Sequence, residues 1–89
     1  MNAEPRMLKQ FPREQQRRLY ELLRAVRQEA GMRQSDLAMV LGQPQSFVSK
    51  YESGERRLDV LELRQVCAAV GTTLAEFARR LDEALSDEA

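Results

Sequence analysis

Residues 43–57 read QPQSFVSKYESGERR, and this stretch decides how the rest of the chain is interpreted. Taken as a helix from Gln45 to Ser53, it has an apolar side formed by Phe47, Val48 and Tyr51. Its polar positions fall within an arc of about 140°, because a helix turns by 100° per residue. They are Gln45, Ser46, Ser49, Lys50 and Ser53. Solvated helix faces are usually rich in Glu, Lys and Arg, so this nearly uncharged face indicates a specific use.

The composition is that of one small domain. The chain has 89 residues, 43% of them hydrophobic, and a formal net charge of zero. No apolar run approaches the roughly 20 residues of a membrane span, and the N-terminus lacks the apolar core of a signal peptide. The lone cysteine, Cys67, cannot form an internal disulfide. We therefore expect a cytoplasmic protein with no membrane partner.

The zero net charge hides an asymmetry along the chain. Residues 1–33 carry eight basic and four acidic side chains, residues 34–57 three of each, and residues 58–89 three basic and seven acidic. Because local charge sets the field that a polyanion meets, the zero total does not exclude nucleic acid. It does argue against a purely electrostatic, non-specific binder.

The four glycines each follow a stretch of helical periodicity and divide the chain into five predicted helices. These begin near residues 13, 34, 45, 59 and 73, and Asp59 with Glu62 and Thr73 with Glu76 predict capping boxes for the last two. We expect a flexible arm at 1–12, a domain at 13–85 and an acidic tail at 86–89. The predicted core positions are Leu19, Leu22, Leu23, Val26, Ala30, Leu37, Ala38, Leu41, Leu61, Leu63, Val66, Cys67, Val70, Leu74, Phe77, Ala78, Leu81 and Leu85.

The sequence lacks the residues and motifs that enzyme activity, a metal site or a cofactor would need. It has no histidine and no glycine-rich phosphate loop, and Cys67 has neither an activating histidine nor a second soft ligand. We therefore expect no enzyme activity, no metal and no cofactor.

A short helix, a tight turn and a second short helix with a polar outer face predict a helix-turn-helix. Glutamine matches the N6 and N7 groups of adenine in the major groove, serine can contact either kind of base edge, and lysine can reach guanine or phosphate. The predicted partner is double-stranded DNA.

Residues 32–56, MRQSDLAMVLGQPQSFVSKYESGER, also resemble a known family. The stretch is similar to the helix-turn-helix of the Cro and phage-repressor-like group, often called XRE-type, and the resemblance covers about residues 15–82. It implies an all-α fold, a five-helix lambda-repressor-like DNA-binding domain whose second and third helices form the helix-turn-helix. Our leading hypothesis is therefore a sequence-specific, repressor-like regulator of transcription that acts as a homodimer.

The resemblance assigns roles to residues. It implies that Gln45 pairs with a base, and that Gln34 contacts phosphate and braces Gln45. Arg27 and Glu52 match a pair that often forms an ion pair between the first and third helices. Further groove-facing positions are Ser46, Ser49 and Lys50, and the loop along the DNA backbone contains Arg56 and Arg57.

Three positions depart from the family pattern. Arg33 stands where a capping threonine is common, so the second helix starts weakly or Arg33 contacts a phosphate instead. Phe47 either packs on the second helix or touches a thymine methyl, and packing is favoured because large apolar groups are usually buried. Glu55 replaces a residue that is often basic, which weakens the expected phosphate contact there.

Two questions of partnership stay open at this level. Leu81 and Leu85 either complete the core of the monomer or form a two-fold dimer contact, and we favour the dimer because one short recognition helix reads few bases. A competing function is an antitoxin or adaptor whose partner is a toxin or another regulator. Its suggestive residues are Met7, Leu8 and Phe11, which could equally pack on their own domain.

Overall fold

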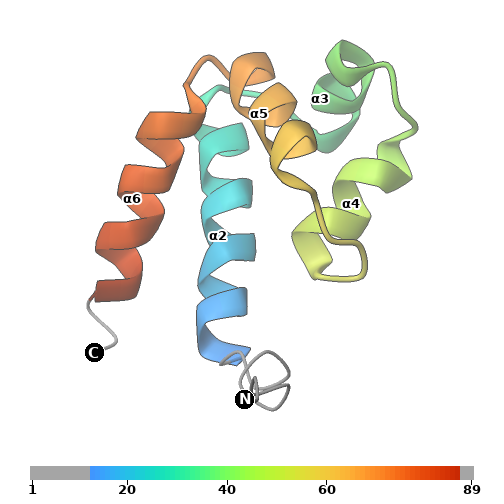
Figure 1. Cartoon of the computed structure of the whole chain (residues 1–89). Helices are drawn as coiled ribbons and strands as arrows, with labels where there is room; N and C mark the ends of the chain where they lie inside the picture. Colours follow the sequence, from blue (N-terminus) through green and yellow to red (C-terminus); the bar gives the residue numbers. More distant parts are fainter. Residues whose placement is uncertain (1–12, 87–89) are drawn as a thin grey trace.

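A computed structural model describes residues 13–86, which contain five helices and no strand. They are α2 (Arg13–Glu29), α3 (Gln34–Leu41), α4 (Gln45–Ser53), α5 (Val60–Ala69) and α6 (Leu74–Ser86). Figure 1 shows α2 and α6 running antiparallel side by side; α5 packs against α6 and α3, and α4 packs against α2 and α3. The expected all-α class is confirmed. The predicted arm, and the tail beyond Ser86, lie outside the described residues.

The helix ends follow local chemistry. Gly42 closes α3 at a left-handed φ of 68°, where its N–H donates to the carbonyl of Met39 at 3.1 Å. The capping box at the start of α5 is complete: Asp59 Oδ1 accepts from the Glu62 N–H at 2.7 Å, and Glu62 Oε1 accepts from the Asp59 N–H at 3.0 Å. The predicted helix boundaries are therefore set by the turn residues in the sequence.

The start of α3 lacks the usual capping side chain, as the sequence predicts. Arg33 occupies the N-cap and its guanidinium cannot accept a hydrogen bond, yet α3 begins at Gln34 as predicted. The carboxylate of Asp36 takes over: Oδ2 accepts from the Arg33 backbone N–H at 2.8 Å, and both oxygens accept from the Arg33 guanidinium at 3.1 Å. A carboxylate in the first turn also faces the positive end of the helix dipole. Asp36 thus supplies one half of a capping box, whereas no side-chain oxygen at position 33 accepts from the first-turn amides as a threonine would.

The core lies where the inner faces of the helices meet. Its fully buried members are Leu23, Val26, Leu37, Ala38, Val48, Tyr51, Val66, Cys67 and Phe77. Three predicted core positions were wrong: Leu61 is 70% exposed, and Ala30 and Ala78 are exposed. The run of apolar residues at the start of α5 allowed more than one inward face. Leu61 lies about 140° around the helix from Val66, so only one of the two can point inward.

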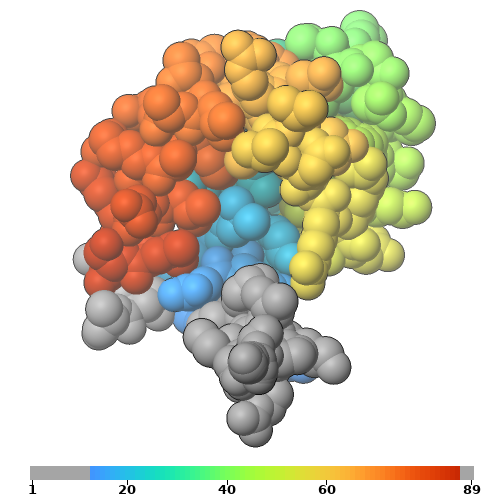
Figure 2. Space-filling view, viewed as in Figure 1, coloured from blue at the N-terminus to red at the C-terminus, as the bar shows by residue number. Residues whose placement is uncertain are grey.

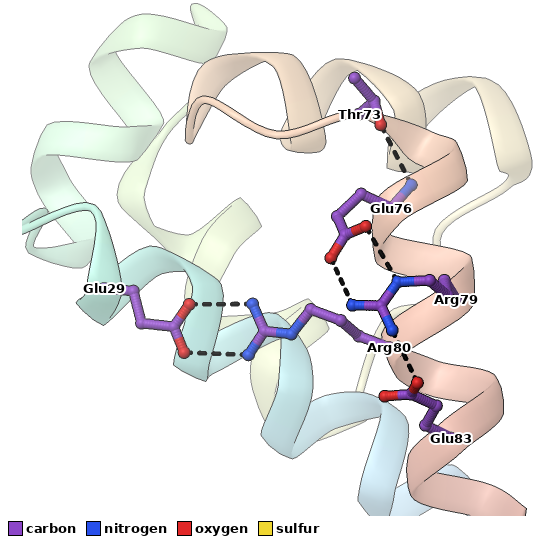
Figure 3. Close-up of polar contacts among 6 residues, drawn as sticks. All are labelled: Glu29, Thr73, Glu76, Arg79, Arg80 and Glu83. Atoms are coloured by element: carbon purple, nitrogen blue, oxygen red, sulfur yellow. Dashed lines mark hydrogen bonds and ion pairs between the residues drawn. The ribbon is translucent and has the colours of Figure 1, made fainter.

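The C-terminal helix is tied to α2 by charge as well as by packing. Figure 3 shows Arg80 of α6 reaching Glu29 of α2 through two parallel hydrogen bonds, both 2.9 Å long. The predicted capping box at Thr73 is half formed: Thr73 accepts from the Glu76 N–H at 3.0 Å, but the Glu76 carboxylate turns to Arg79 instead. Leu81 packs against the core, as one of its two predicted roles requires, and Leu85 is half-buried.

A cleft of about 230 Å³ opens beside the end of α4. Leu19, Tyr20 and Leu23 of α2 form one wall, and Leu58 and Leu63 lie opposite. Figure 2 shows α2 at the floor of a hollow between α6 and the segment that follows α4. The loop between α4 and α5 therefore lies next to α2, across this cleft. That loop contains the two predicted phosphate-binding arginines.

Candidate nucleic-acid interface

The α3–α4 unit has the geometry of a helix-turn-helix. Gly42, Gln43 and Pro44 join the two helices, and Pro44 enters α4 with φ of −63°. Val48 and Tyr51 of α4 have no exposed surface and anchor the helix in the core. The predicted division of α4 into an anchored apolar side and an exposed polar side is therefore confirmed.

The polar side of α4 is open to solvent. Gln45, Ser46, Lys50 and Ser53 are exposed, and Ser49 is half-buried. The Ser49 hydroxyl donates to the carbonyl of Ser46 at 3.2 Å, and the Ser53 hydroxyl donates to that of Lys50 at 3.0 Å. A hydroxyl that has donated its proton keeps its acceptor lone pairs. Ser49 therefore presents an acceptor outward, a polarity that the sequence does not reveal.

A buried ion pair holds α4 against α2. Arg27 Nε donates to Glu52 Oε2 at 2.7 Å and Arg27 Nη2 donates to Oε1 at 3.0 Å, while Nη1 donates to the Met32 carbonyl at 2.8 Å. The Glu52 side chain has no exposed surface. The hydrogen bond to Glu52 raises the pKa of Arg27, and burial acts in the opposite direction. The pair that the family resemblance implied is thus present, and it is buried.

From Glu52 a line of hydrogen bonds runs to the surface of α4. Gln34 Nε2 donates to Glu52 Oε1 at 3.1 Å, and Gln45 Nε2 donates to Gln34 Oε1 at 3.5 Å, the outer limit for such a bond. Because a carboxylate can only accept, Glu52 requires the amide nitrogen of Gln34 to face inward. The Gln34 oxygen then faces Gln45, whose own oxygen and second N–H remain available. Gln34 therefore lies where bracing of Gln45 requires it.

Phe47 packs on its own domain, which is the favoured of its two predicted roles. The ring is half-buried against the core, and its centroid lies 5.6 Å from that of Tyr51 in an edge-to-face arrangement of 78°. On the other side the Arg56 guanidinium carbon lies 4.6 Å from the centroid of the Phe47 ring. Sequence reasoning missed this stack, since it depends on how the loop after α4 folds back.

The two loop arginines differ in their surroundings. Arg56 donates to Glu62 Oε2 at 2.9 Å and to Oε1 at 3.2 Å. These hydrogen bonds raise the pKa of Arg56 and lower that of Glu62. Arg57 is exposed, and within residues 13–86 its side chain makes no hydrogen bond or ion pair. Of the two residues, Arg57 is the one whose charge is uncompensated.

The chain is similar to known proteins in both sequence and structure. Residues 23–84 match the model of the helix-turn-helix family HTH_3. A similar solved structure is that of an XRE-family like protein from Pseudomonas syringae pv. tomato str. DC3000, with a TM-score of 0.74 and 42% identity over 80% of this chain and 87% of that chain. The chain belongs to the XRE-type helix-turn-helix family. No curated protein matches it.

As a member of the XRE-type family, the chain is a DNA-binding helix-turn-helix regulator with the lambda-repressor-like fold. Regulators of this family are generally not enzymes. In the part of the chain that the structure describes, no three potential metal ligands lie together. Nor does that part contain a helix with the length and apolar character needed to cross a membrane.

Proposed function

We propose that this XRE-type protein is a sequence-specific, repressor-like transcriptional regulator that acts in the cytoplasm. Its recognition helix is α4, which enters the major groove and presents Gln45, Ser46, Ser49 and Lys50 to base edges. A domain bound there at a promoter excludes other proteins from the same DNA, which is why we favour repression.

The observation that carries this proposal is the hydrogen-bonded line from Glu52 through Gln34 to Gln45. An exposed glutamine usually samples many rotamers, and fixing one of them costs side-chain entropy on binding. Gln45 is instead biased toward one rotamer by Gln34, whose Oε1 lies 3.5 Å from Gln45 Nε2, and Gln34 donates to the buried Glu52 carboxylate at 3.1 Å. In that rotamer Gln45 offers one acceptor and one donor side by side, the pattern that matches adenine.

Phosphate contacts complete the proposed interface. Arg57 is exposed in the loop after α4, and the Arg33 side chain is 82% exposed at the start of α3. Arg33 forms an ion pair with Asp36, so its contribution to phosphate binding is weaker than that of Arg57. Such contacts fix the register of the protein on the duplex, while the glutamine and serines read sequence.

We propose that two copies bind a roughly palindromic operator. A two-fold dimer places two recognition helices about 34 Å apart, in successive major grooves. The predicted contact residues were Leu81 and Leu85, and Leu85 is half-buried in the last turn of α6. Leu81 contributes mainly to the monomer, because it packs on the core. The reason for a dimer remains the small number of base pairs that one helix can read.

Selection of bound duplexes from random DNA tests the whole proposal. We expect the selected sequences to contain two inverted half-sites, with their centres separated by about 10 base pairs or a multiple of this. Fluorescence anisotropy on the selected duplex, against a scrambled one of equal length, then gives affinity and salt dependence. Binding that is insensitive to both sequence and salt would refute the proposed function, and half-sites without symmetry would refute the dimer alone.

A second candidate function is binding of a partner protein, as an antitoxin or adaptor does. Its suggestive residues Met7, Leu8 and Phe11 lie outside the described part of the chain. The observation that favours it is apolar exposure on α3 and α5: Met39 is 81% exposed, Val40 58%, Val60 61% and Leu61 70%. A toxin or restriction enzyme encoded next to this protein would identify the partner to test. Co-purification that is lost on deleting residues 1–12, with half-site binding intact, would support this role.

A further inference from the structure

Arg56 connects three parts of the domain at once. Its backbone N–H donates to the Lys50 carbonyl at 3.1 Å, which satisfies one of the free carbonyls at the end of α4. Its guanidinium lies over the ring of Phe47, a residue of the first turn of α4. The same guanidinium forms a two-point contact with Glu62 in the first turn of α5. Arg56 therefore joins both ends of α4 to α5: its backbone N–H contacts the C-terminal end of α4, and its side chain contacts the first turn of α4 and Glu62.

Glu62 is itself held in place from a second direction. Its Oε1 accepts from the Asp59 N–H at 3.0 Å, so the carboxylate that binds Arg56 also caps α5. The Arg56 hydrogen bond and this backbone hydrogen bond both lower the pKa of Glu62, which keeps it charged. A planar guanidinium bound to two carboxylate oxygens and stacked on an aromatic ring has its preferred contacts occupied.

A phosphate would have to compete with these contacts. The Arg56 side chain is 39% exposed and already neutralised by a carboxylate, whereas the neighbouring Arg57 is exposed and bears an uncompensated charge. Moving Arg56 onto DNA would leave Glu62 unpaired beside the polyanion and would uncover the face of the Phe47 ring. Both changes oppose binding, because like charges repel and apolar surface becomes wet.

We infer that Arg56 is a positioning residue, which fixes the recognition helix against α5 through Phe47 and Glu62, and that Arg57 alone of the two loop arginines binds phosphate. This inference rests on the proposed DNA-binding function and divides the roles that the sequence assigned jointly to Arg56 and Arg57. It makes Phe47 and Glu62 determinants of specificity although neither is placed on a base.

The salt dependence of binding separates a positioning residue from a phosphate ligand. Each phosphate contact that is lost lowers the slope of log K against log salt concentration by about 0.9. The double variant Arg56→Gln/Glu62→Gln removes one positive and one negative charge, so it leaves the net charge unchanged. We expect its slope to equal that of the wild-type protein. The ratio of specific to non-specific affinity should fall about three- to tenfold, the range expected of exposed cation–π and ion-pair contacts.

The matched control, Arg57→Gln, should lower the slope by about 0.9 and leave the ratio of specific to non-specific affinity unchanged.

Arg56→Lys is the second test, because lysine keeps the charge but cannot form the planar two-point contact or the same stack. A positioning role predicts a loss of specificity like that of the double variant; a phosphate role predicts nearly wild-type binding. The double variant would overturn the inference by lowering the slope while keeping the specificity ratio, and so would a fully specific Arg56→Lys protein. If the wild-type protein itself shows no sequence dependence, the proposed function fails, which is a different result. Thermal unfolding of each variant confirms that the compared proteins are folded.

Discussion

The guanidinium of Arg27 and the carboxylate of Glu52 face each other through two hydrogen bonds of 2.7 Å and 3.0 Å, between the first described helix and the recognition helix. The Glu52 side chain is fully buried and that of Arg27 is 10% exposed. Glu52 also accepts from Gln34, so one carboxylate contacts both α2 and the polar side of the α3–α4 unit. On the proposed function, stability and recognition are coupled at this residue.

Breaking this pair from one side should be strongly destabilising. Arg27→Met leaves the Glu52 carboxylate buried with the Gln34 amide and the more distant Arg24, whose Nε lies 3.7 Å away. We expect the free energy of unfolding to fall by about 3–5 kcal/mol. The double variant Arg27→Met/Glu52→Leu removes both charges, so it should be less destabilised than Arg27→Met. Urea denaturation monitored by circular dichroism measures both, and a double variant that is the less stable of the two would contradict this account.

Gln45 and Gln34 should affect sequence recognition to different degrees. Gln45→Ala removes the proposed base contact and is expected to weaken specific binding by about 1–3 kcal/mol and to relax one base position. Gln34→Ala leaves that contact in place but frees its rotamer, so a loss of about 1 kcal/mol is expected. Gln28→Ala, a change at an exposed glutamine of α2, is the matched control and should have no effect. Anisotropy on single-base variants of the operator checks the order, which would be contradicted if Gln34→Ala were the more harmful.

Gly54 and Gly42 provide a matched comparison of glycine positions. Both lie in the left-handed region, with φ of 88° and 68°, and a side chain there costs about 1–2 kcal/mol. A Cβ on Gly42 would meet nothing within 4 Å, whereas one on Gly54 would lie 2.7 Å from Cε2 of Tyr20. Gly54→Ala should therefore cost a further 1–3 kcal/mol, roughly, through displacement of the Tyr20 ring. Equal unfolding free energies for the two variants would show that the ring moves away without cost.

The sequence was informative where local chemistry decides the structure. Asp59 with Glu62 predicts the start of α5 correctly, because a capping box needs only residues three apart. The two-sided character of α4 follows in the same way from a period of 3.6 residues. Pairing of Arg27 with Glu52 came from the family resemblance, and only the structure shows that the pair is buried.

What the sequence could not show depends on the angles between helices. The stack of Arg56 on Phe47 requires the loop after α4 to fold back over the first turn of that helix. Leu61 was placed in the core because several apolar residues follow Asp59, and the packing of α5 on α6 decides which of them face inward. Neither property is encoded in a short spacing rule. Both nevertheless bear on the proposed function, since they set which loop arginine has an uncompensated charge and which apolar residues remain exposed.

Tyr51 gives the protein a predicted sensitivity to alkaline pH. Its hydroxyl is buried and, among the described residues, has no hydrogen-bond partner. Burial raises the pKa of Tyr51 above its ordinary value of about 10, with the nearby charge of Glu52 acting in the same direction. The folded state therefore keeps this proton at a pH where the unfolded chain has released it. Stability is unaffected below about pH 10 and falls above it, by up to about 1.4 kcal/mol per pH unit for one proton.

Tyr51→Phe tests this sign directly, because it removes the hydroxyl and keeps the ring. At neutral pH the variant should be as stable as the wild-type protein or about 1 kcal/mol more stable, since an unpaired buried polar group is lost. Above pH 10 its unfolding free energy should fall less steeply than that of the wild-type protein. Burial also raises the pKa of the Cys67 thiol, but this group is present in both proteins, so the difference between the two curves isolates Tyr51. Urea denaturation at intervals from pH 7 to pH 11 would show parallel curves if the hydroxyl were in fact hydrogen-bonded to solvent.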